Sequence, residues 1–277
     1  DDLANASYHG LLNVTEAITL KYGAWEGQPW IEGGASVPSA RLVGELVRHA
    51  DLDSDGTIEA INLVSYSGGG TGQFVHLAVS RFAKGVVDNF ATAPIGDRVM
   101  IRDLRIENDV ILVDLVQAGS HDGACCPGDA LTRAWQLQPE GLVELPAVGE
   151  VQRLSPSLLA GIDWQLARWS HDEPVDEEIV VTLSWIDGRF VGRSACNRYF
   201  AGVKSGDGPA SSLVLDGVGS TRMACTDEQH AAAEARFLGA LEQVNRLYFL
   251  AGDLVLYWGE GTDFGALYFK RADPSGH

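Results

Sequence analysis

The chain has 277 residues, 45% of them hydrophobic and 21% charged, a composition typical of a packed globular protein of one large or two ordinary domains. Its 20 Lys and Arg residues against 38 Asp and Glu residues give a formal net charge of 20 − 38 = −18, which argues against nucleic acid and anionic lipid as partners. No apolar run reaches the roughly 18–20 residues needed to span a bilayer. The start at Asp1-Asp2, with neither an initiator Met nor an apolar leader, indicates a chain whose signal segment has been removed; an ordinary cytosolic chain is the alternative.

Residues 1–137 have the pattern of a β-rich domain. Short segments alternate apolar and polar residues, Val, Ile and aromatic residues are frequent, and Gly, Asp and Asn separate the segments. No segment of this half has a long apolar stripe with a 3.6-residue period. The expected strands are Ile18–Leu20, Glu59–Val64, Phe74–Ser80, Val99–Ile106, Val110–Val116 and Thr132–Leu137, whereas Arg41–His49 fits either a strand or one short helix.

The acidic segment Asp51-Leu52-Asp53-Ser54-Asp55-Gly56-Thr57-Ile58-Glu59 is typical of a loop that wraps oxygen atoms around a hard cation. Calcium prefers about six to eight oxygen ligands, and this loop offers four carboxylates and the Thr57 carbonyl. An EF-hand does not fit, because position twelve is Asn62 and no helix is expected on either side. The spacing resembles the calcium loops of integrin-like and related β-repeat proteins, although Glu59 stands where they usually have Asp. We therefore expect a calcium site formed by Asp51, Asp53, Asp55, Thr57 and Glu59; the alternative is a solvated acidic turn built on Asp55-Gly56.

The glycine-rich segment Ser67-Gly68-Gly69-Gly70-Thr71-Gly72 lies between two expected strands. It matches neither a dinucleotide-binding nor a P-loop pattern, and no helix follows it to present an N-terminal dipole to phosphate. Ser67 also lacks the glycine-flanked elbow of a hydrolase nucleophile. We expect a flexible hairpin loop.

The segment Ser120-His121-Asp122-Gly123-Ala124-Cys125-Cys126-Pro127 places a His, an Asp and two thiols close together. Such a cluster can bind a soft metal, or it can supply a nucleophile and a base. Adjacent cysteines rarely both point at one metal. The favoured interpretation is a turn that carries an oxidised or partly buried cysteine pair.

The stretch from Pro139 to Pro156 contains three prolines and few aromatic residues, which is typical of a linker. We place the domain boundary near residue 150. The sequence thus predicts a β-rich domain over residues 1–150, which includes the calcium loop and the linker, and a second domain over residues 151–277.

The second domain again begins with strands. We expect a strand at Trp164–Leu166, an acidic loop at His171–Glu178, and a hairpin of Ile179–Trp185 and Arg189–Ala195 around the turn Ile186-Asp187-Gly188. A second hairpin pairs Leu247–Leu250 with Leu254–Trp258, and Ala266–Arg271 closes the sheet.

One helix is expected directly after Cys225. Thr226-Asp227-Glu228-Gln229 matches a capping box, in which Thr226 caps the helix and Gln229 reaches back. Ala233, Phe237, Leu241 and Val244 then recur at intervals of four, four and three residues and form one apolar stripe. This stripe predicts a helix that packs on a sheet.

Two segments, Gly192–Gly202 and Ser220–Cys225, together resemble the signature of the META domain, the family that includes the bacterial heat-shock protein HslJ. The resemblance covers residues 158–271. It implies a strongly curved antiparallel sheet with one packed helix, and hence a mainly β fold with some α. It also implies a cell-envelope or stress-linked protein, periplasmic or lipoprotein-derived, but no particular reaction. The N-terminal half is similar to an uncharacterised β-domain that precedes META domains in some bacterial envelope proteins.

Each signature segment contains one cysteine. Cys196 ends an expected strand and Cys225 directly precedes the helix, so a disulfide between them would hold the helix start against that strand. This bond presupposes an oxidising compartment; two buried reduced thiols are the alternative. Cys125 and Cys126 then remain as a second pair or as free thiols.

The polar residues of the signature are expected to be structural, because neither segment contains a His. Asn197 fits a turn former, and Arg198 and Arg222 fit partners for an acidic surface.

Together with the context that the META resemblance implies, the sequence predicts a non-enzymatic, stress-related binding protein of the bacterial cell envelope, periplasmic or outer-membrane-associated, with a calcium-stabilised first domain. Its partner would be an envelope protein or component, bound through the second sheet or its aromatic edge, formed by Tyr199, Phe200 and Trp258. One alternative is a secreted inhibitor of a foreign hydrolase that uses the loop Ser65–Gln73 or Gly119–Pro127. A second is a hydrolase that uses His121, Asp122 and Cys125.

Overall fold

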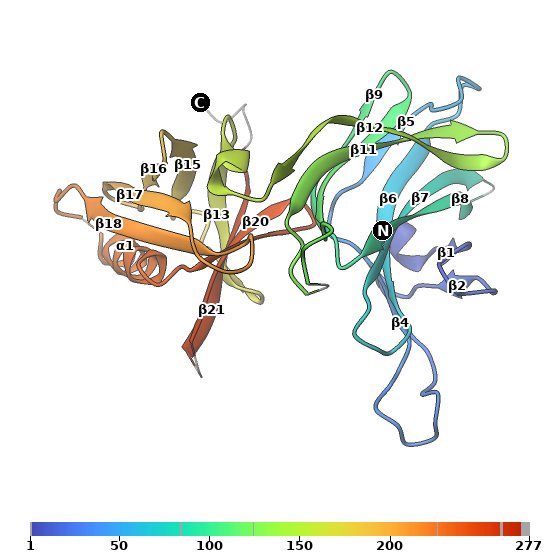
Figure 1. Ribbon diagram of the computed structural model, residues 1–277, viewed down its shortest axis with the longest axis horizontal. Coiled ribbons are helices and arrows are strands. Elements are labelled where there is room, and N and C mark those ends of the chain that lie inside the picture. The colour runs from blue at the N-terminus through green and yellow to red at the C-terminus, as the bar shows by residue number, and fades with distance from the viewer. Residues whose placement is uncertain (1, 84, 124, 226, 261–262, 273–277) are drawn as a thin grey trace. The chain divides into compact units, whose positions relative to one another are not determined.

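The computed structural model describes residues 2–83, 85–123, 125–225, 227–260 and 263–272. The chain divides into two compact units, Asp1–Gln152 and Arg153–His277. Both consist mainly of β-strands (Figure 1), and the α-helix found among the described residues, α1 (Glu228–Leu241), belongs to the second unit. The predicted fold class, mainly β with some α, is confirmed.

The first unit contains two sheets. The larger has the strand order β2-β1-β8-β7-β6-β4-β3, with β5 also paired to β6, and the smaller has the order β12-β11-β10-β9. The long pairings are antiparallel, whereas β1 pairs with β8 in parallel. The strands are β1 (Ser7–Tyr8), β2 (Ile18–Thr19), β3 (Ala24–Glu26), β4 (Ser39–Leu42), β5 (Arg48–Ala50), β6 (Glu59–Ser67), β7 (Phe74–Ala83), β8 (Val86–Asp97), β9 (Met100–Glu107), β10 (Val110–Gln117), β11 (Asp129–Gln138) and β12 (Gly141–Arg153), and a 3-10 turn covers Leu3–Asn5.

Hydrophobic clusters cover both faces of the larger sheet. One cluster joins Ile61 and Leu63 of β6 to strands of the smaller sheet, including Trp135 of β11. The other joins Val64 and Tyr66 of β6 to the N-terminal segment around β1 and β2. Strand β6 is therefore covered on both sides, in keeping with the burial of seven of its nine residues.

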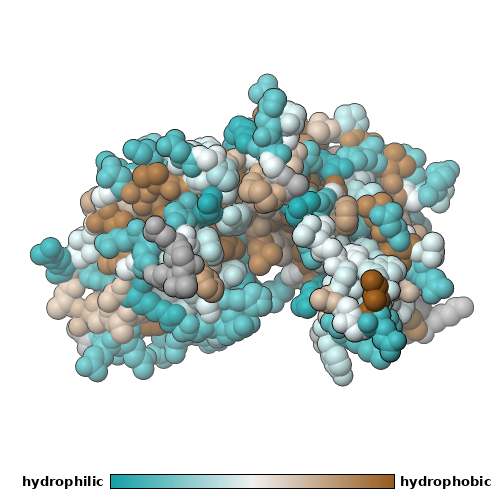
Figure 2. Space-filling model, turned by 60° about the horizontal axis from the view of Figure 1, so that its bottom comes forward, coloured by the Kyte–Doolittle hydropathy of each residue, from teal (hydrophilic) through white to brown (hydrophobic). Residues whose placement is uncertain are grey.

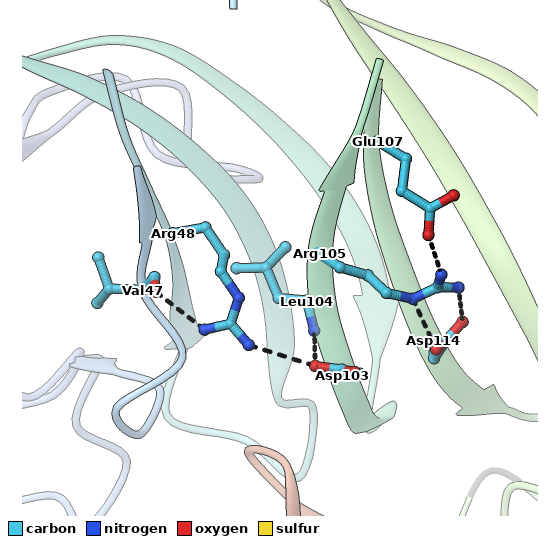
Figure 3. A network of polar contacts seen from close by, with 7 residues as sticks. All are labelled: Val47, Arg48, Asp103, Leu104, Arg105, Glu107 and Asp114. Carbon is cyan, nitrogen blue, oxygen red and sulfur yellow. Dashed lines mark hydrogen bonds and ion pairs between the residues drawn. The ribbon is translucent and has the colours of Figure 1, made fainter. Parts of the chain in front are cut away.

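Arginine–carboxylate pairs connect neighbouring strands of this unit (Figure 3). Arg105 of β9 donates to Asp114 of β10 from Nε at 3.3 Å and from NH2 at 3.1 Å. Arg48 of β5 lies 3.4 Å from Asp103 of β9 and so links the two sheets. Burial alone would raise the pKa of Asp114, but hydrogen bonds from Arg105 and Thr132 bring it below its ordinary value. Asp114 is therefore held as a paired carboxylate.

The stretch expected to be a linker is a strand instead. Strand β12 (Gly141–Arg153) forms an edge of the smaller sheet, and most of its residues are exposed. An edge strand tolerates Pro146, because the missing N–H can be on the side that has no neighbouring strand. The unit boundary falls at the end of this strand, between Gln152 and Arg153.

Two other segments differ from their predicted form. Arg41–His49 is neither one strand nor a helix, since β4 ends at Leu42 and β5 begins at Arg48. The long strand β8 was not among the expected strands, and it pairs along the whole of β7 with register shifts at Val75/His76 and Val79/Ser80.

The second unit is one curved sheet with the order β18-β17-β16-β15-β13-β21-β20-β19, and β14 also pairs with β13. The two edge strands meet: Ser212 forms a bridge with Arg246, and Leu213 N donates to Asn245 O at 2.8 Å. The strands are β13 (Asp163–Ser170), β14 (Glu173–Pro174), β15 (Thr182–Ile186), β16 (Arg189–Arg193), β17 (Arg198–Ser205), β18 (Leu213–Ser220), β19 (Arg246–Leu250), β20 (Asp253–Glu260) and β21 (Asp263–Arg271), preceded by a 3-10 turn at Pro156–Leu159. The last strand does not close the sheet as expected but lies between β13 and β20.

Helix α1 packs through its apolar stripe. Phe237 and Leu241 are fully buried, and the Phe237 ring meets Tyr199 of β17 edge-on with centroids 5.0 Å apart. The capping residue is Asp227, whose side chain accepts from the N–H groups of Gln229 and His230; Thr226 lies outside the described residues. The helix ends at Leu241, so Val244 packs beyond it.

Candidate functional site

The acidic loop of the first unit brings three of its carboxylates together. Ligand oxygens of Asp51, Asp53 and Glu59 all lie within 4.8 Å of one another. Because calcium–oxygen distances are about 2.3–2.6 Å, one ion between these oxygens can contact all three. Asp55 lies outside this group: its Oδ1 accepts from Thr57 N at 2.7 Å.

Backbone N–H groups hold the loop in shape. Leu52 N donates to Glu59 Oε2 at 2.9 Å, and Gly56 N donates to Asp51 Oδ2 at 3.0 Å. Gly56 has a φ of 87°, in the left-handed region that favours glycine. The tight turn predicted at Asp55-Gly56 is therefore present.

Arg81 of β7 provides a positive charge that the sequence did not reveal. Its NH2 lies 3.3 Å from Asp53 Oδ2 and 3.3 Å from Glu59 Oε1, and its NH1 lies 3.7 Å from Asp55 Oδ2. The sequence carries no signal for this contact, because Arg81 comes from a neighbouring strand, where it pairs with Glu59 across β6 and β7.

Glu59 is the buried member of the cluster. Its side chain is fully buried, and Oε1 receives no hydrogen bond despite the nearby Arg81. Burial raises the pKa of Glu59, opposed by the hydrogen bond from Leu52, and the charges of Asp53 and Asp55 raise it further. A buried carboxylate oxygen therefore faces the cluster without a hydrogen-bond donor.

In the second unit, Asn197 joins the two signature segments to the helix. Its side chain is 2% exposed and donates to Met223 O at 3.1 Å and to Glu234 Oε1 at 2.8 Å. Its Oδ1 accepts from Thr221 Oγ1 at 2.7 Å and Met223 N at 2.8 Å. The expectation that Asn197 is structural agrees with this network. Glu234 of α1, which the sequence gave no reason to select, completes it.

The glycine at position 192 is required by a close approach. A Cβ atom there would lie 2.1 Å from the carbonyl oxygen of Thr182 on β15. The same carbonyl accepts from the Tyr199 hydroxyl at 2.9 Å. This part of the signature is therefore explained by close packing of the backbone and not by a catalytic or binding role.

All four cysteines are bonded. Cys196 joins Cys225 across 29 residues, and Cys125 joins its neighbour Cys126. Cys196, Cys225 and Glu234 lie close enough to hold a metal, but both sulfurs are already in the disulfide. The hydrolase alternative needs Cys125 as a thiol nucleophile, and the bond to Cys126 removes that thiol.

A groove of about 630 Å³ opens beside the signature segments. Its lining residues are Thr182, Val191, Gly192, Arg193, Cys196, Arg198, Tyr199 and Met223. Arg193 and Arg198 are direct cross-strand partners on β16 and β17, and both are exposed.

The arginines of the signature segments do not form the expected pairs with acidic surface residues. Among the described residues, Arg193, Arg198 and Arg222 form no ion pair, and Arg193 Nε donates to the carbonyl of Ala195 at 2.7 Å. The expected aromatic edge also needs correction. Phe200 is 49% exposed, but Tyr199 is only 3% exposed, because alternate residues of β17 face the interior.

The glycine-rich loop connects β6 and β7 as predicted, but a neighbouring loop holds it. Trp30 Nε1 donates to Gly68 O at 2.6 Å, and Ser36 Oγ donates to Gly69 O at 2.8 Å. In the second candidate loop, Gly119 N donates to Asp122 Oδ2 at 2.8 Å. These contacts anchor both loops.

The surface shown in Figure 2 is largely hydrophilic, with hydrophobic residues in small separate patches. Within the part of the chain that the structure describes, no helix combines the length and the apolar character that crossing a membrane requires.

Residues 157–271, which lie in the second unit, match the family model of the META domain. Two disulfides fit an extracytoplasmic location. No curated protein shows significant similarity to the chain.

Proposed function

We propose that the protein is a non-enzymatic binding protein of the bacterial cell envelope, periplasmic or derived from a lipoprotein, that acts in the stress response. Its META domain binds an envelope protein or component, and its first unit is stabilised by calcium. The absence of a free thiol at Cys125 and the structural use of Asn197 both support a non-catalytic role.

The observation that carries the binding proposal is the outer face of β16 and β17. This face, which we call the β16–β17 face, presents Val191, Arg193, Arg198 and Phe200. An exposed aromatic ring beside exposed arginines is a composition enriched at binding sites. Since the whole chain has a net charge of −18, the local excess of positive charge is not a property of the surface in general.

Site-specific photocrosslinking in intact envelopes tests this face. A photoreactive amino acid in place of Phe200 is expected to give a defined adduct. The same amino acid in place of Leu250, which is 48% exposed in the same unit, is expected to give none. Equal labelling from both positions, or no adduct from position 200, would contradict a binding role for the β16–β17 face.

The calcium proposal rests on the fit of the acidic loop to a hard cation. Asp51, Asp53 and Glu59 supply closely spaced oxygens, and Glu59 Oε1 is buried without a hydrogen bond. A bound cation would coordinate that oxygen directly and offset the repulsion among the carboxylates. Arg81 partly offsets it already, so calcium must compete with the guanidinium.

Calorimetric titration of the chelator-stripped full-length protein tests the site. We expect one calcium site, loss of binding in Asp53→Ala, and unchanged binding in Glu140→Ala, which removes an exposed acid outside the loop. Arg81→Gln should bind calcium more tightly, because the competing positive charge is gone. Equal affinity of wild type and Asp53→Ala would leave only an acidic turn.

A further inference from the structure

We infer that the groove beside Arg193 and Arg198 binds a carboxylate carried by a short apolar group. This inference rests on the proposal that the META domain is a binding module, and it specifies the ligand chemistry. The groove volume of about 630 Å³ lies within the range of small-molecule sites, roughly 300–1,000 Å³.

The charge of the groove favours an anionic ligand. Arg193 and Arg198 lie directly opposite each other on adjacent antiparallel strands, and like charges in that position destabilise a sheet. Neither forms an ion pair among the described residues, although the chain contains 38 Asp and Glu. The two segments that form the signature, 192–202 and 220–225, contain three arginines and no acid. A bound anion would reduce the repulsion between Arg193 and Arg198, which no acidic side chain among the described residues offsets.

The arginines favour a planar anion. A guanidinium offers parallel N–H donors that match the two oxygens of a carboxylate. Nε of Arg193 already donates to Ala195 O, which fixes that side chain and leaves its terminal nitrogens available. Arg198 has no side-chain hydrogen bond among the described contacts.

The remaining lining limits the size of the apolar part. Val191, Cys196 and Met223 supply the apolar wall, and Met223 is 62% exposed. This wall can cover one aliphatic side chain but offers no enclosed tunnel for a long acyl chain. The matching chemistry is a carboxylate next to a short aliphatic group, as at the C-terminal residue of a peptide or in a short-chain acid.

Protein-observed NMR titration of the full chain tests the inference with three probes. N-acetyl-leucine carries the carboxylate and the aliphatic group, N-acetyl-leucinamide lacks the charge, and hexanoate lacks the peptide group. We expect N-acetyl-leucine to shift signals of residues that line the groove, and N-acetyl-leucinamide to bind at least about tenfold more weakly. Binding of hexanoate at similar strength identifies the carboxylate as sufficient, whereas its failure identifies a peptide end as the source.

Charge-removing variants locate the site. Arg193→Gln and Arg198→Gln should each weaken N-acetyl-leucine binding about tenfold, while Lys204→Gln on the same strand β17 should leave it unchanged. Because all three residues are exposed, the substitutions should not disturb the fold. An unchanged melting temperature of each variant verifies this. Equal binding of acid and amide, no binding of either acid, or equal affinity of the arginine variants and wild type would overturn the inference. A crosslinked adduct at position 200 would, in that case, leave the proposed binding function standing.

Discussion

A single buried amide, Asn197, accounts for most of the polar character of the META signature at the residue scale. It satisfies both donors and the carbonyl of its side chain between Met223, Thr221 and Glu234. Buried polar groups with full hydrogen bonding specify one local structure, and losing one partner leaves the others unsatisfied. The signature residues therefore join two chain segments to α1.

Asn197→Asp should destabilise the second unit by about 2–4 kcal/mol, because a carboxylate replaces the donor that faces Glu234 and buries a second negative charge. Thr221→Val, which removes one hydrogen bond of the same network, should cost only about 1 kcal/mol. Urea unfolding followed by probes in each unit measures both. Equal, small effects of the two variants would argue against Asn197 as the centre of the network.

His76 predicts a pH effect in the first unit. Its ring is fully buried, and Nε2 accepts from Leu12 N at 2.9 Å, so the ring is held neutral. Burial lowers the pKa of His76, partly offset by backbone hydrogen bonds. The neutral form is thus favoured by folding, and stability is lost as pH falls below the unfolded value of about 6.5.

In His76→Gln, which can still accept from Leu12 N, the stability of the first unit should depend less on pH between about 6.5 and 5. Chemical denaturation at several pH values measures this dependence. The same slope in variant and wild type would show that His76 does not titrate on unfolding.

At the scale of elements, the sequence predicts structure well where one face is buried. The stripe through Phe237 and Leu241 predicts α1, and alternation predicts β9 and β10 to within about one residue. Prediction from the sequence fails for β12, because an exposed edge strand has little apolar pattern and accommodates Pro146. It also cannot find Arg81 or Glu234, because both reach their sites from elements that are distant along the chain.

The two disulfides differ in what they constrain. The Cys196–Cys225 bond closes 29 residues, for which chain entropy gives about 3–4 kcal/mol, whereas Cys125–Cys126 links adjacent residues and restricts the unfolded chain very little. Cys125 is exposed, and Cys196 and Cys225 are half-buried.

The Cys125–Cys126 bond should therefore be reduced at a lower dithiothreitol concentration than Cys196–Cys225, because access to an attacking thiolate is easier. The double variant Cys196→Ser/Cys225→Ser should lose about 3–4 kcal/mol, and Cys125→Ser/Cys126→Ser should lose far less. Alkylation of the reduced thiols and peptide mapping give the order of reduction, and denaturation gives the stabilities. Simultaneous reduction of both bonds would contradict this assignment.

At the scale of the whole molecule, the chain is two compact units with unequal charge. Residues 1–152 contain 9 Lys and Arg and 21 Asp and Glu, a net charge of 9 − 21 = −12, and residues 153–277 contain 11 and 17, a net charge of 11 − 17 = −6. The more acidic unit holds the proposed cation loop, and the less acidic unit holds the arginine groove. Each unit has its own buried residues, so each is expected to unfold as a separate cooperative transition.

The 153–277 fragment should accordingly fold alone and melt cooperatively, with the same midpoint as the second-unit transition of the full chain. Circular dichroism of the fragment measures this. An aggregated or molten fragment would mean that the second unit depends on the first.

Thermal unfolding of the chelator-stripped full-length protein, recorded with and without calcium, tests the central claim most directly. Only the transition of the first unit should move. Its stability should rise by about 2.7 kcal/mol when free calcium is one hundred times the dissociation constant. The rise should fade as pH falls through the raised pKa of Glu59, because calcium needs the carboxylate deprotonated. A first-unit transition that is insensitive to calcium at neutral pH, or one that moves equally in Asp53→Ala, would contradict the account.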